Sequence, residues 1–218
     1  MKGEKMDFYS IVNKRRTIRD FTEEPVPQEI IKRIIEAGSK APSNDHMRDW
    51  QFFVATDREL IAKILKKIPK KVSDKRMDFI VKMWKLDDKL QEDMFRDAVP
   101  KQYEMLIRSG CLILPFYKQE VPFAKFKQMF DLNDFASIWC CVQNMLLAAT
   151  AEGLGAVMRI PFEAEQTHIA ELLEVPKGYI MPCYLAIGHP ANNLKVHKQH
   201  SFDLDKNTHF NEWRKEDN

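Results

Sequence analysis

Residues 143–157 read Q-N-M-L-L-A-A-T-A-E-G-L-G-A-V and close a long apolar segment of the chain. Over 135–152, apolar residues fall on nearly every side of the helix that this segment would form. Asn133 or Asp134 could cap the start of the helix, and Gly153 stands where a helix commonly ends in a left-handed residue. A helix that is apolar almost all round is typical of a protein interior. We therefore expect a central core helix at 135–152.

Hydrophobic spacing on either side of this helix predicts the remaining elements. Further helices are expected at 7–15, 30–38, 59–68 and 163–173, and a helical pattern with a break at Pro100 fills 77–107. Strands are expected at 51–55, 111–117, 156–159 and 179–188. Gly38 would stop the second helix, and Pro115 would place the end of its strand towards a sheet edge. Because helices outnumber strands and the two kinds are interspersed, the order favours an α+β fold.

Length and composition favour one domain over 1–218, since 44% of the 218 residues are hydrophobic. Residues 63–105 are rich in Met, Trp, Lys and Asp and are expected to form a variable helical excursion. Residues 191–218 are polar and lack the apolar residues to fold alone. We expect this C-terminal extension to wrap over something else, such as a second subunit.

Charge gives no general reason to expect a nucleic-acid partner, because the net charge is only +2. The locally basic segment 58–76 contains no aromatic residue to stack on bases, which favours a solvated helix face. The first residues, M-K-G-E-K-M-D-F, lack the apolar core of a signal peptide, and polar residues interrupt the longest apolar run. We expect a soluble cytoplasmic protein with no membrane partner.

The four cysteines, Cys111, Cys140, Cys141 and Cys183, form no C-x-x-C pair, and three of them lie in apolar surroundings. This pattern favours buried thiols in a reducing compartment over a disulfide framework or a zinc site. The histidines also lack the spacing of metal ligands, so no metal site is expected.

A cluster of positive charge stands near the start of the chain, at Arg15, Arg16 and Arg19, with Thr17 among them. Guanidinium groups donate paired hydrogen bonds to phosphate oxygens, and a threonine hydroxyl adds another donor. Three arginines at the end of a helix cannot all point the same way, so one could reach a separate acceptor. The alternative is a surface cluster balanced by nearby carboxylates such as Asp20.

A polar turn follows the second predicted helix and carries Pro42, Ser43, Asn44 and His46. Turn residues expose backbone amides and place short side chains where a planar ligand could meet them. His46 could donate a hydrogen bond or a proton to such a ligand, or it could simply be a histidine in a turn.

The glycines of G-L-G-A-V-M-R-I-P, from Gly153 to Pro161, follow a helix and do not lie between a strand and a helix, so they are no dinucleotide fingerprint. They indicate a helix end and a tight turn, with a backbone edge near Met158 to Pro161 that could face a ligand. A phosphate-binding Walker loop and a nucleophile elbow are both absent from the sequence. The sequence therefore shows no machinery of an ATPase or a hydrolase.

Four motifs in order resemble the nitroreductase family of flavin mononucleotide (FMN) oxidoreductases. They are R-R-T-I-R-D-F at 15–21, A-P-S-N-D-H-M-R-D-W at 41–50, the quoted residues 143–157, and L-A-I-G-H-P at 185–190. Their order and spacing agree with the family from about residue 9 to residue 190, and 58–109 is the least similar part. The resemblance implies an α+β fold with a central mixed sheet flanked by helices. It also implies an intertwined homodimer with two FMN sites at its interface.

The resemblance also implies roles for particular residues. The FMN phosphate and ribityl chain would be held by Arg15, Arg16 and Thr17, and from the C-terminal segment by His197 or Lys198. Arg19 would face the N1/O2 edge of the flavin ring, where positive charge stabilises the reduced, anionic form. The wall contributed by the partner subunit would consist of Pro42, Ser43, Asn44 and His46. The backbone amide of Ile160 would lie near flavin N5.

Some positions depart from the family pattern. Many members have asparagine in place of His46 and a Q-P pair in place of Arg48 and Asp49. The turn near N5 is often glycine-rich, whereas here it is 159–161, R-I-P, which is bulkier and more basic and would favour an anionic substrate. These departures concern the substrate and the electron donor more than FMN.

The resulting hypothesis is an FMN-dependent oxidoreductase of the nitroreductase type. It would pass hydride from NADH or NADPH through flavin N5 to a small electron-poor acceptor, such as a nitroaromatic or a quinone. No side chain would act as a catalytic nucleophile, because the chemistry belongs to the cofactor. The alternative is a flavin-binding or sensing module with little turnover. A family member specialised for one metabolite is a third possibility.

Overall fold

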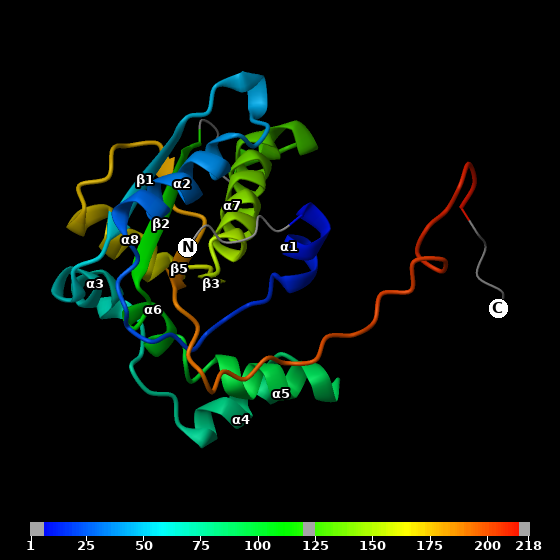
Figure 1. The fold of residues 1–218 in the computed structure, drawn as a ribbon, viewed down its shortest axis with the longest axis horizontal. Helices are drawn as coiled ribbons and strands as arrows, with labels where there is room; N and C mark the ends of the chain where they lie inside the picture. The colour runs from blue at the N-terminus through cyan, green and yellow to red at the C-terminus, as the bar shows by residue number, and fades with distance from the viewer. Residues whose placement is uncertain (1–6, 120–124, 214–218) are drawn as a thin grey trace.

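A computed structural model of the chain describes residues 7–119 and 125–213, so the last residues of the predicted 191–218 extension lie outside the description. Helices and strands form an α+β arrangement, with a sheet between helices (Figure 1). The helices are α1 (Phe8–Lys14), α2 (Gln28–Ser39), α3 (Arg58–Ile64), α4 (Asp74–Met83), α5 (Lys89–Ala98), α6 (Glu104–Ile107), α7 (Asn133–Ala151) and α8 (Glu163–Leu172). The strands are β1 (Trp50–Ala55), β2 (Cys111–Lys118), β3 (Gly155–Arg159), β4 (Tyr179–Ile180) and β5 (Tyr184–Gly188). Short 3₁₀ turns are η1 (Asn44–His46), η2 (Leu65–Lys67) and η4 (Met129–Leu132).

The sheet has the strand order β1-β2-β5-β3, and β4 also pairs with β2. All these pairs are antiparallel, and the parallel part of the expected mixed sheet is an isolated bridge between Thr17 and Ala156. Pro115 does not lie at an edge, as the sequence suggested, because β2 has neighbours on both sides. It pairs with Phe52 of β1, and on the other side of β2 it falls between the part that pairs with β5 and the part that pairs with β4.

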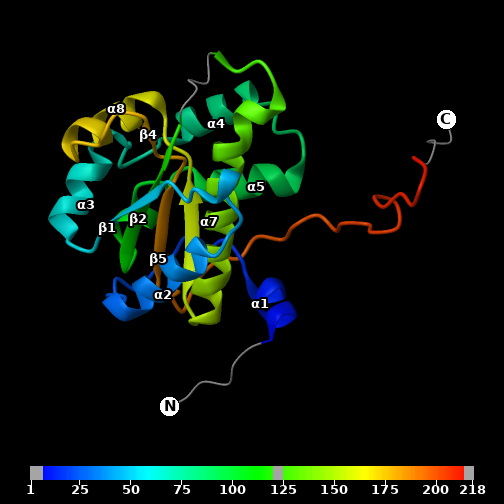
Figure 2. The same cartoon turned by 90° about the horizontal axis from the view of Figure 1, so that it is seen from above.

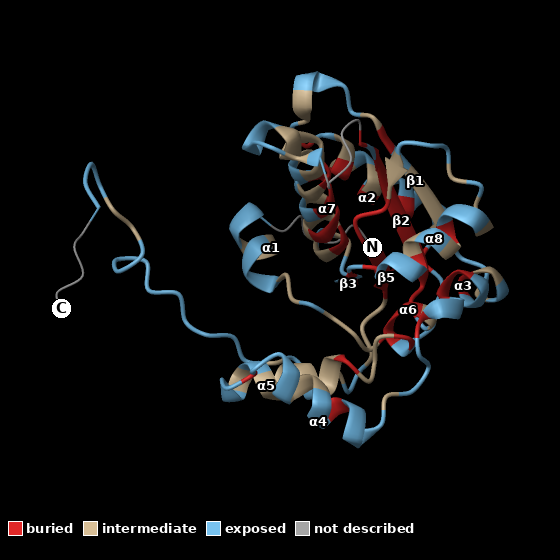
Figure 3. Cartoon of the chain, turned by 180° about the vertical axis from the view of Figure 1, so that it is seen from behind, coloured by how far each residue is buried: buried red, intermediate tan, exposed pale blue. Residues whose placement is uncertain are grey.

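Both faces of the sheet are buried, and successive residues of β2 supply the two sides of the core. Cys111 and Ile113 face a cluster with α2 and α7, whereas Leu112 and Leu114 face a cluster with α3, α6 and α8. Figure 2 shows α7 on one side of the strands and α3 with α8 on the other, and Figure 3 shows that burial is concentrated along these strands and α7. The predicted central core helix is therefore confirmed.

The ends of α7 and α2 differ partly from the prediction. The chain enters α7 directly from η4, so Asn133 and Asp134 lie in the first helical turn and do not cap it. Gly153 has a φ of 75° after the helix, as expected. Gly38, in contrast, is a buried residue inside α2 and does not stop it. Its lack of a side chain lets α2 lie close to α7.

Replacing Gly38 by alanine is expected to lower the free energy of unfolding by about 1–3 kcal/mol. A Cβ atom at residue 38 would come within 2.6 Å of Met145 Cγ and 3.0 Å of Cys141 Sγ. This overlap should outweigh the better helix propensity of alanine, which is worth about 1 kcal/mol. Urea denaturation measures the change, with Ser39→Ala on the same helix as the control. Stability equal to that of the wild type would contradict the close packing of α2 on α7.

The chain beyond β5 forms no helix or strand over 191–213 and runs past α5 away from the body of the protein (Figure 1). It carries exposed apolar side chains at Phe202, Leu204, Phe210 and Trp213. Within the described residues, no helix is both long and apolar enough to cross a bilayer.

Candidate functional site

Two of the clustered arginines, Arg16 and Arg19, line a cavity of about 320 Å³, here called the arginine pocket. Three separate parts of the chain form it, namely the segment after α1, the helix α5 and the C-terminal segment. Its lining residues are Arg16, Thr17, Arg19, Leu90, Gln91, Met94, Val196, His197, Lys198, Gln199 and His200. The pocket therefore joins five of the predicted cofactor-binding residues, which come from opposite ends of the sequence.

The two arginines of the pocket are held differently. Arg16 donates from Nη2 to the carbonyl oxygen of His197 at 2.5 Å, which ties the start of the chain to its end. Arg19 is half-buried, and its Nη2 lies 3.6 Å from Met94 Sδ on α5. Burial lowers the pKa of Arg19, while the charges of Asp97 and Asp20 oppose that shift. An arginine stays charged under such conditions, so the pocket holds a partly desolvated positive charge.

A chain of charged groups behind the arginine pocket links the end of α5 to the segment after α1 and to the C-terminal segment. Lys101 lies 3.0 Å from Asp20 and 3.1 Å from Asp97, and His197 Nε2 lies 3.0 Å from the other oxygen of Asp97. Burial alone would raise the pKa of Asp97, but hydrogen bonds from His197 and Lys101 bring it below its ordinary value. The Asp97 carboxylate therefore engages Nε2 of His197, a residue that was predicted to bind phosphate, and the neighbouring Lys198 is exposed.

The polar turn lines a second, smaller cavity of about 140 Å³, here called the turn pocket. The turn is joined to the start of α7 by two hydrogen bonds. The Asn44 N–H donates to Ser137 Oγ at 2.9 Å, and Asn44 Nδ2 donates to Asp134 Oδ1 at 3.3 Å. Ser43 Oγ accepts from the Arg48 N–H at 3.2 Å. Asp45 and His46 adopt the left-handed conformation, with φ of 48° and 58°. This backbone presents a rigid polar edge.

The two pockets are separate within one chain. In Figure 1 the turn η1, which lines the turn pocket, is the light-blue segment at the top, whereas α5, which lines the arginine pocket, is at the bottom. Four predicted residues line neither cavity, namely Arg15, Pro42, His46 and Ile160. Of these, Ile160 is 64% exposed immediately after β3. One chain thus brings the predicted site together only in part.

The turn after β3 is not basic, although its sequence suggested so. Arg159 is 6% exposed and forms a two-pronged ion pair with Glu165, which is 3% exposed. Arg159 Nη2 donates to Glu165 Oε1 at 2.7 Å, and its Nε donates to Gln102 Oε1 at 2.9 Å. The guanidinium charge is neutralised inside the protein, so Arg159 cannot attract an anionic substrate.

Sequence reasoning missed Gln102, Glu165, Asp97 and Lys101, and only Glu165 had a local signal, as an acidic residue in the first turn of α8. Three of the cysteine thiols, those of Cys111, Cys141 and Cys183, are buried, and burial raises the pKa of each to about 12. Such thiols are poor nucleophiles at neutral pH. Among the residues that the structure describes, no group of three or more His, Cys, Asp or Glu side chains is placed to hold a metal ion.

Comparisons with known proteins agree with this architecture. The profile described as "Nitroreductase family" matches residues 12–189. Iodotyrosine deiodinase 1 of Rattus norvegicus is 30% identical over 200 residues, which are 90% of this chain and 66% of the rat protein. A protein of Methanothermobacter thermautotrophicus named "Putative NADH dehydrogenase/NAD(P)H nitroreductase" is 28% identical over 215 residues, 97% of this chain and 91% of that protein.

A solved structure of similar fold is an iodotyrosine deiodinase bound to FMN and 3-iodo-L-tyrosine, with a TM-score of 0.67. It is 21% identical, and the match covers 92% of this chain and 99% of that one. At this identity the likeness establishes the fold, which is nitroreductase-like. The chain spans less than two thirds of the length of the rat deiodinase.

Proposed function

The chain belongs to the nitroreductase family, and on that basis we propose that it is an FMN-dependent oxidoreductase. It would use NADH or NADPH to reduce a small electron-poor acceptor such as a nitroaromatic or a quinone. The observation that carries the proposal is the arginine pocket, which gathers five residues of the expected FMN site from segments about 180 positions apart in the chain.

The residues of the arginine pocket fit FMN by their chemistry. Guanidinium and ammonium groups suit a phosphate, and the Thr17 hydroxyl suits a ribityl chain. Leu90 and Met94 add an apolar surface of the kind that a flat ring needs. The solved deiodinase of similar fold contains FMN, which supports the same assignment here.

The chemistry that FMN supplies when bound is hydride transfer between NAD(P)H and the acceptor through flavin N5. The chain's own residues would bind and orient the reactants. Arg15, Arg16 and Thr17 would hold the phosphate end, and Arg19 would put its charge against the N1/O2 edge of the ring. The backbone amide of Ile160 would face N5.

We further propose a homodimer in which each FMN lies between an arginine pocket and the turn pocket of the other copy. Within one chain, η1 at the turn pocket and α5 at the arginine pocket lie at opposite ends (Figure 1). Large apolar side chains also remain exposed on α1, where Phe8 is 62% and Tyr9 is 75% exposed, and along the C-terminal segment. A second subunit would cover such surfaces.

Reductive removal of a halogen from an aromatic ring is a second candidate activity, because curated relatives at 30% identity are named iodotyrosine deiodinases. The flavin-binding module with little turnover is the alternative from another class. The identity of the acceptor that is reduced distinguishes the two enzyme activities. Ile160 and its neighbours differ from the glycine-rich turn of many family members.

Steady-state oxidation of NADH and NADPH by the FMN-loaded protein tests the proposal. Acceptors should include a nitroaromatic, a quinone and 3-iodo-L-tyrosine. We expect turnover with the nitroaromatic or the quinone in the presence of one of the two donors. Turnover with 3-iodo-L-tyrosine and with neither other acceptor would favour the deiodinase activity. Bound FMN that shows no turnover with any pair of donor and acceptor would favour the flavin-binding module.

A further inference from the structure

A third and larger cavity lies outside the two pockets that the cofactor would use. It has a volume of about 790 Å³, within the range of small-molecule sites, and is here called the α4 cavity. It lies between α4, the loop before it, the end of α5 and the turn after β3. Its lining residues are Pro69, Lys71, Val72, Ser73, Arg76, Ile80, Met83, Trp84, Val99, Gln102, Arg159 and Phe162.

The wall of the α4 cavity is mainly apolar and includes two aromatic rings. Trp84 is 47% exposed and Phe162 is 66% exposed, and the Arg159 guanidinium lies over the Phe162 ring at 5.6 Å. Flat aromatic ligands pack well against such rings. The apolar wall therefore favours an aromatic ligand over a sugar or a free phosphate.

The charged groups of the cavity are all positive. Lys71 and Arg76 are exposed lining residues, and no lining residue is acidic. Within the described ranges, no ion pair involves either side chain; Arg76 instead lies over the ring of Phe79 at 5.0 Å. Arg159 contributes no free charge, because Glu165 neutralises it. The cavity thus offers two unneutralised cations beside an apolar wall.

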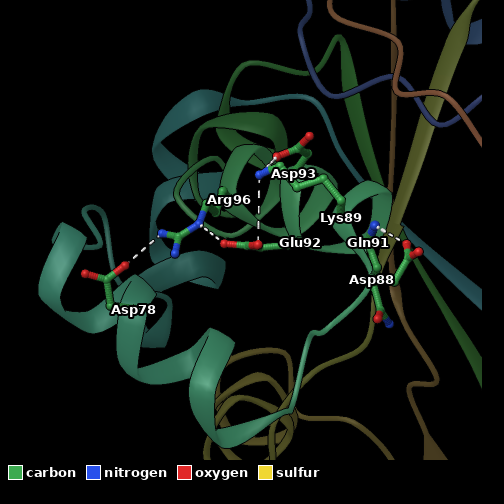
Figure 4. Close-up of polar contacts among 7 residues, drawn as sticks. All are labelled: Asp78, Asp88, Lys89, Gln91, Glu92, Asp93 and Arg96. Atoms are coloured by element: carbon green, nitrogen blue, oxygen red, sulfur yellow. Dashed lines mark hydrogen bonds and ion pairs between the residues drawn. The ribbon is translucent and has the colours of Figure 1, made fainter.

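The helix α4, which carries Arg76, contacts α5 through an ion pair and a ring contact. Arg96 on α5 lies 2.8 Å from Asp78 on α4 and 2.7 Å from Glu92 (Figure 4). The rings of Trp84 and Phe95 meet edge to face with centroids 5.3 Å apart. These contacts join α4 and Trp84 to α5 at the edge of the cavity.

The cavity shares a turn of the chain with the proposed site of reaction. Arg159 and Phe162 line it, and Ile160 lies between them in the chain. Ile160 is the residue whose backbone amide would face flavin N5 under the proposed function. The cavity wall and the proposed N5 contact therefore belong to the same turn of the chain.

We propose that the α4 cavity binds the electron acceptor and selects flat aromatic compounds that carry an anionic group. The ring would pack on Trp84 and Phe162, and the anion would face Lys71 and Arg76. This inference rests on the proposed function. For a nitroaromatic carboxylate the two-electron step converts the nitro compound, NAD(P)H and a proton into the nitroso compound, NAD(P)⁺ and water.

Steady-state kinetics with shape-matched acceptors test this selectivity. The FMN-loaded protein should have a KM for 4-nitrobenzoate about tenfold below that for uncharged 4-nitrobenzamide, as expected for one charge-assisted hydrogen bond. Arg76→Gln and Lys71→Gln should each bring the ratio of the two KM values closer to one. Lys75→Gln, which removes a neighbouring charge on α4 from outside the cavity, should leave the ratio unchanged.

Calorimetric titration of the FMN-free protein with 4-nitrobenzoate gives a second readout that needs no turnover. Binding that weakens in Arg76→Gln and not in Lys75→Gln would support the cavity assignment even if NAD(P)H oxidation failed, in which case only the proposed function would fall. Normal turnover with equal KM values for the two acceptors, unchanged in Arg76→Gln and Lys71→Gln, would overturn the inference and leave the proposed function standing.

Discussion

Replacing Glu165 by alanine is expected to lower the free energy of unfolding by about 3–5 kcal/mol, because it leaves a buried charge without a partner. Arg159 is 6% exposed, so its guanidinium group could not recover hydration without disturbing the turn after β3. For a chain of this size the loss corresponds to a fall in Tm of about 6–20 °C. Thermal and urea denaturation measure it directly.

An exposed arginine–glutamate pair that also forms two hydrogen bonds provides the control. Arg33 donates to Glu152 through Nε at 2.8 Å and Nη2 at 2.7 Å, but the Arg33 side chain is 53% exposed. Arg33→Ala should cost no more than about 1 kcal/mol, since exposed ion pairs contribute little. Changing Arg159 to Met together with Glu165 to Leu should recover most of the stability lost in Glu165→Ala. Equal losses in Glu165→Ala and Arg33→Ala would contradict the assigned burial.

Replacing Arg19 by alanine is expected to lower the midpoint potential of bound FMN by about 60 mV. A positive group placed against developing negative charge in a partly desolvated site contributes about 3 kcal/mol, and 30 mV corresponds to about 1.4 kcal/mol for a two-electron couple. FMN binding should also weaken, roughly tenfold. Equilibration with redox dyes measures the potential, and fluorescence titration measures the affinity.

Arg19→Lys is the control for this prediction, because it keeps the positive charge while removing the planar donor fork. It should retain most of the potential and lose part of the affinity. Potential and affinity that are unchanged in Arg19→Ala would show that Arg19 does not face the cofactor.

Local sequence pattern sufficed where an element depends on its own residues. The strand at 51–55 and the core helix at 135–152 were predicted because their hydrophobic pattern extends over the whole element. The role of Gly38 was predicted wrongly, because it depends on contact with Met145 on a helix far away in the sequence. In the sequence, a glycine near the end of a helical pattern looks the same whether it ends the helix or lets the helix pack closely on another.

The candidate site shows the same division. The pattern of Arg16, Thr17 and Arg19 was recognisable, and the structure brings these residues together with His197 and Lys198. The ion-pair partners of these residues could not be predicted, because they lie in distant segments of the chain or are positioned by a loop. Asp97 meets His197 only after α5 and the C-terminal segment are placed side by side. Likewise the helical pattern at 77–107 gave no indication of the cavity beneath α4.

The central claim is that this chain binds FMN and uses it to pass electrons from NAD(P)H to an acceptor. Anaerobic titration of the FMN-reconstituted protein tests it most directly, with the visible flavin absorption as the readout. We expect one FMN per chain, bleaching by one equivalent of NADH or NADPH, and return of the colour on adding a stoichiometric amount of a nitroaromatic or a quinone. A protein that binds no FMN, or whose bound FMN neither donor bleaches, would contradict the account.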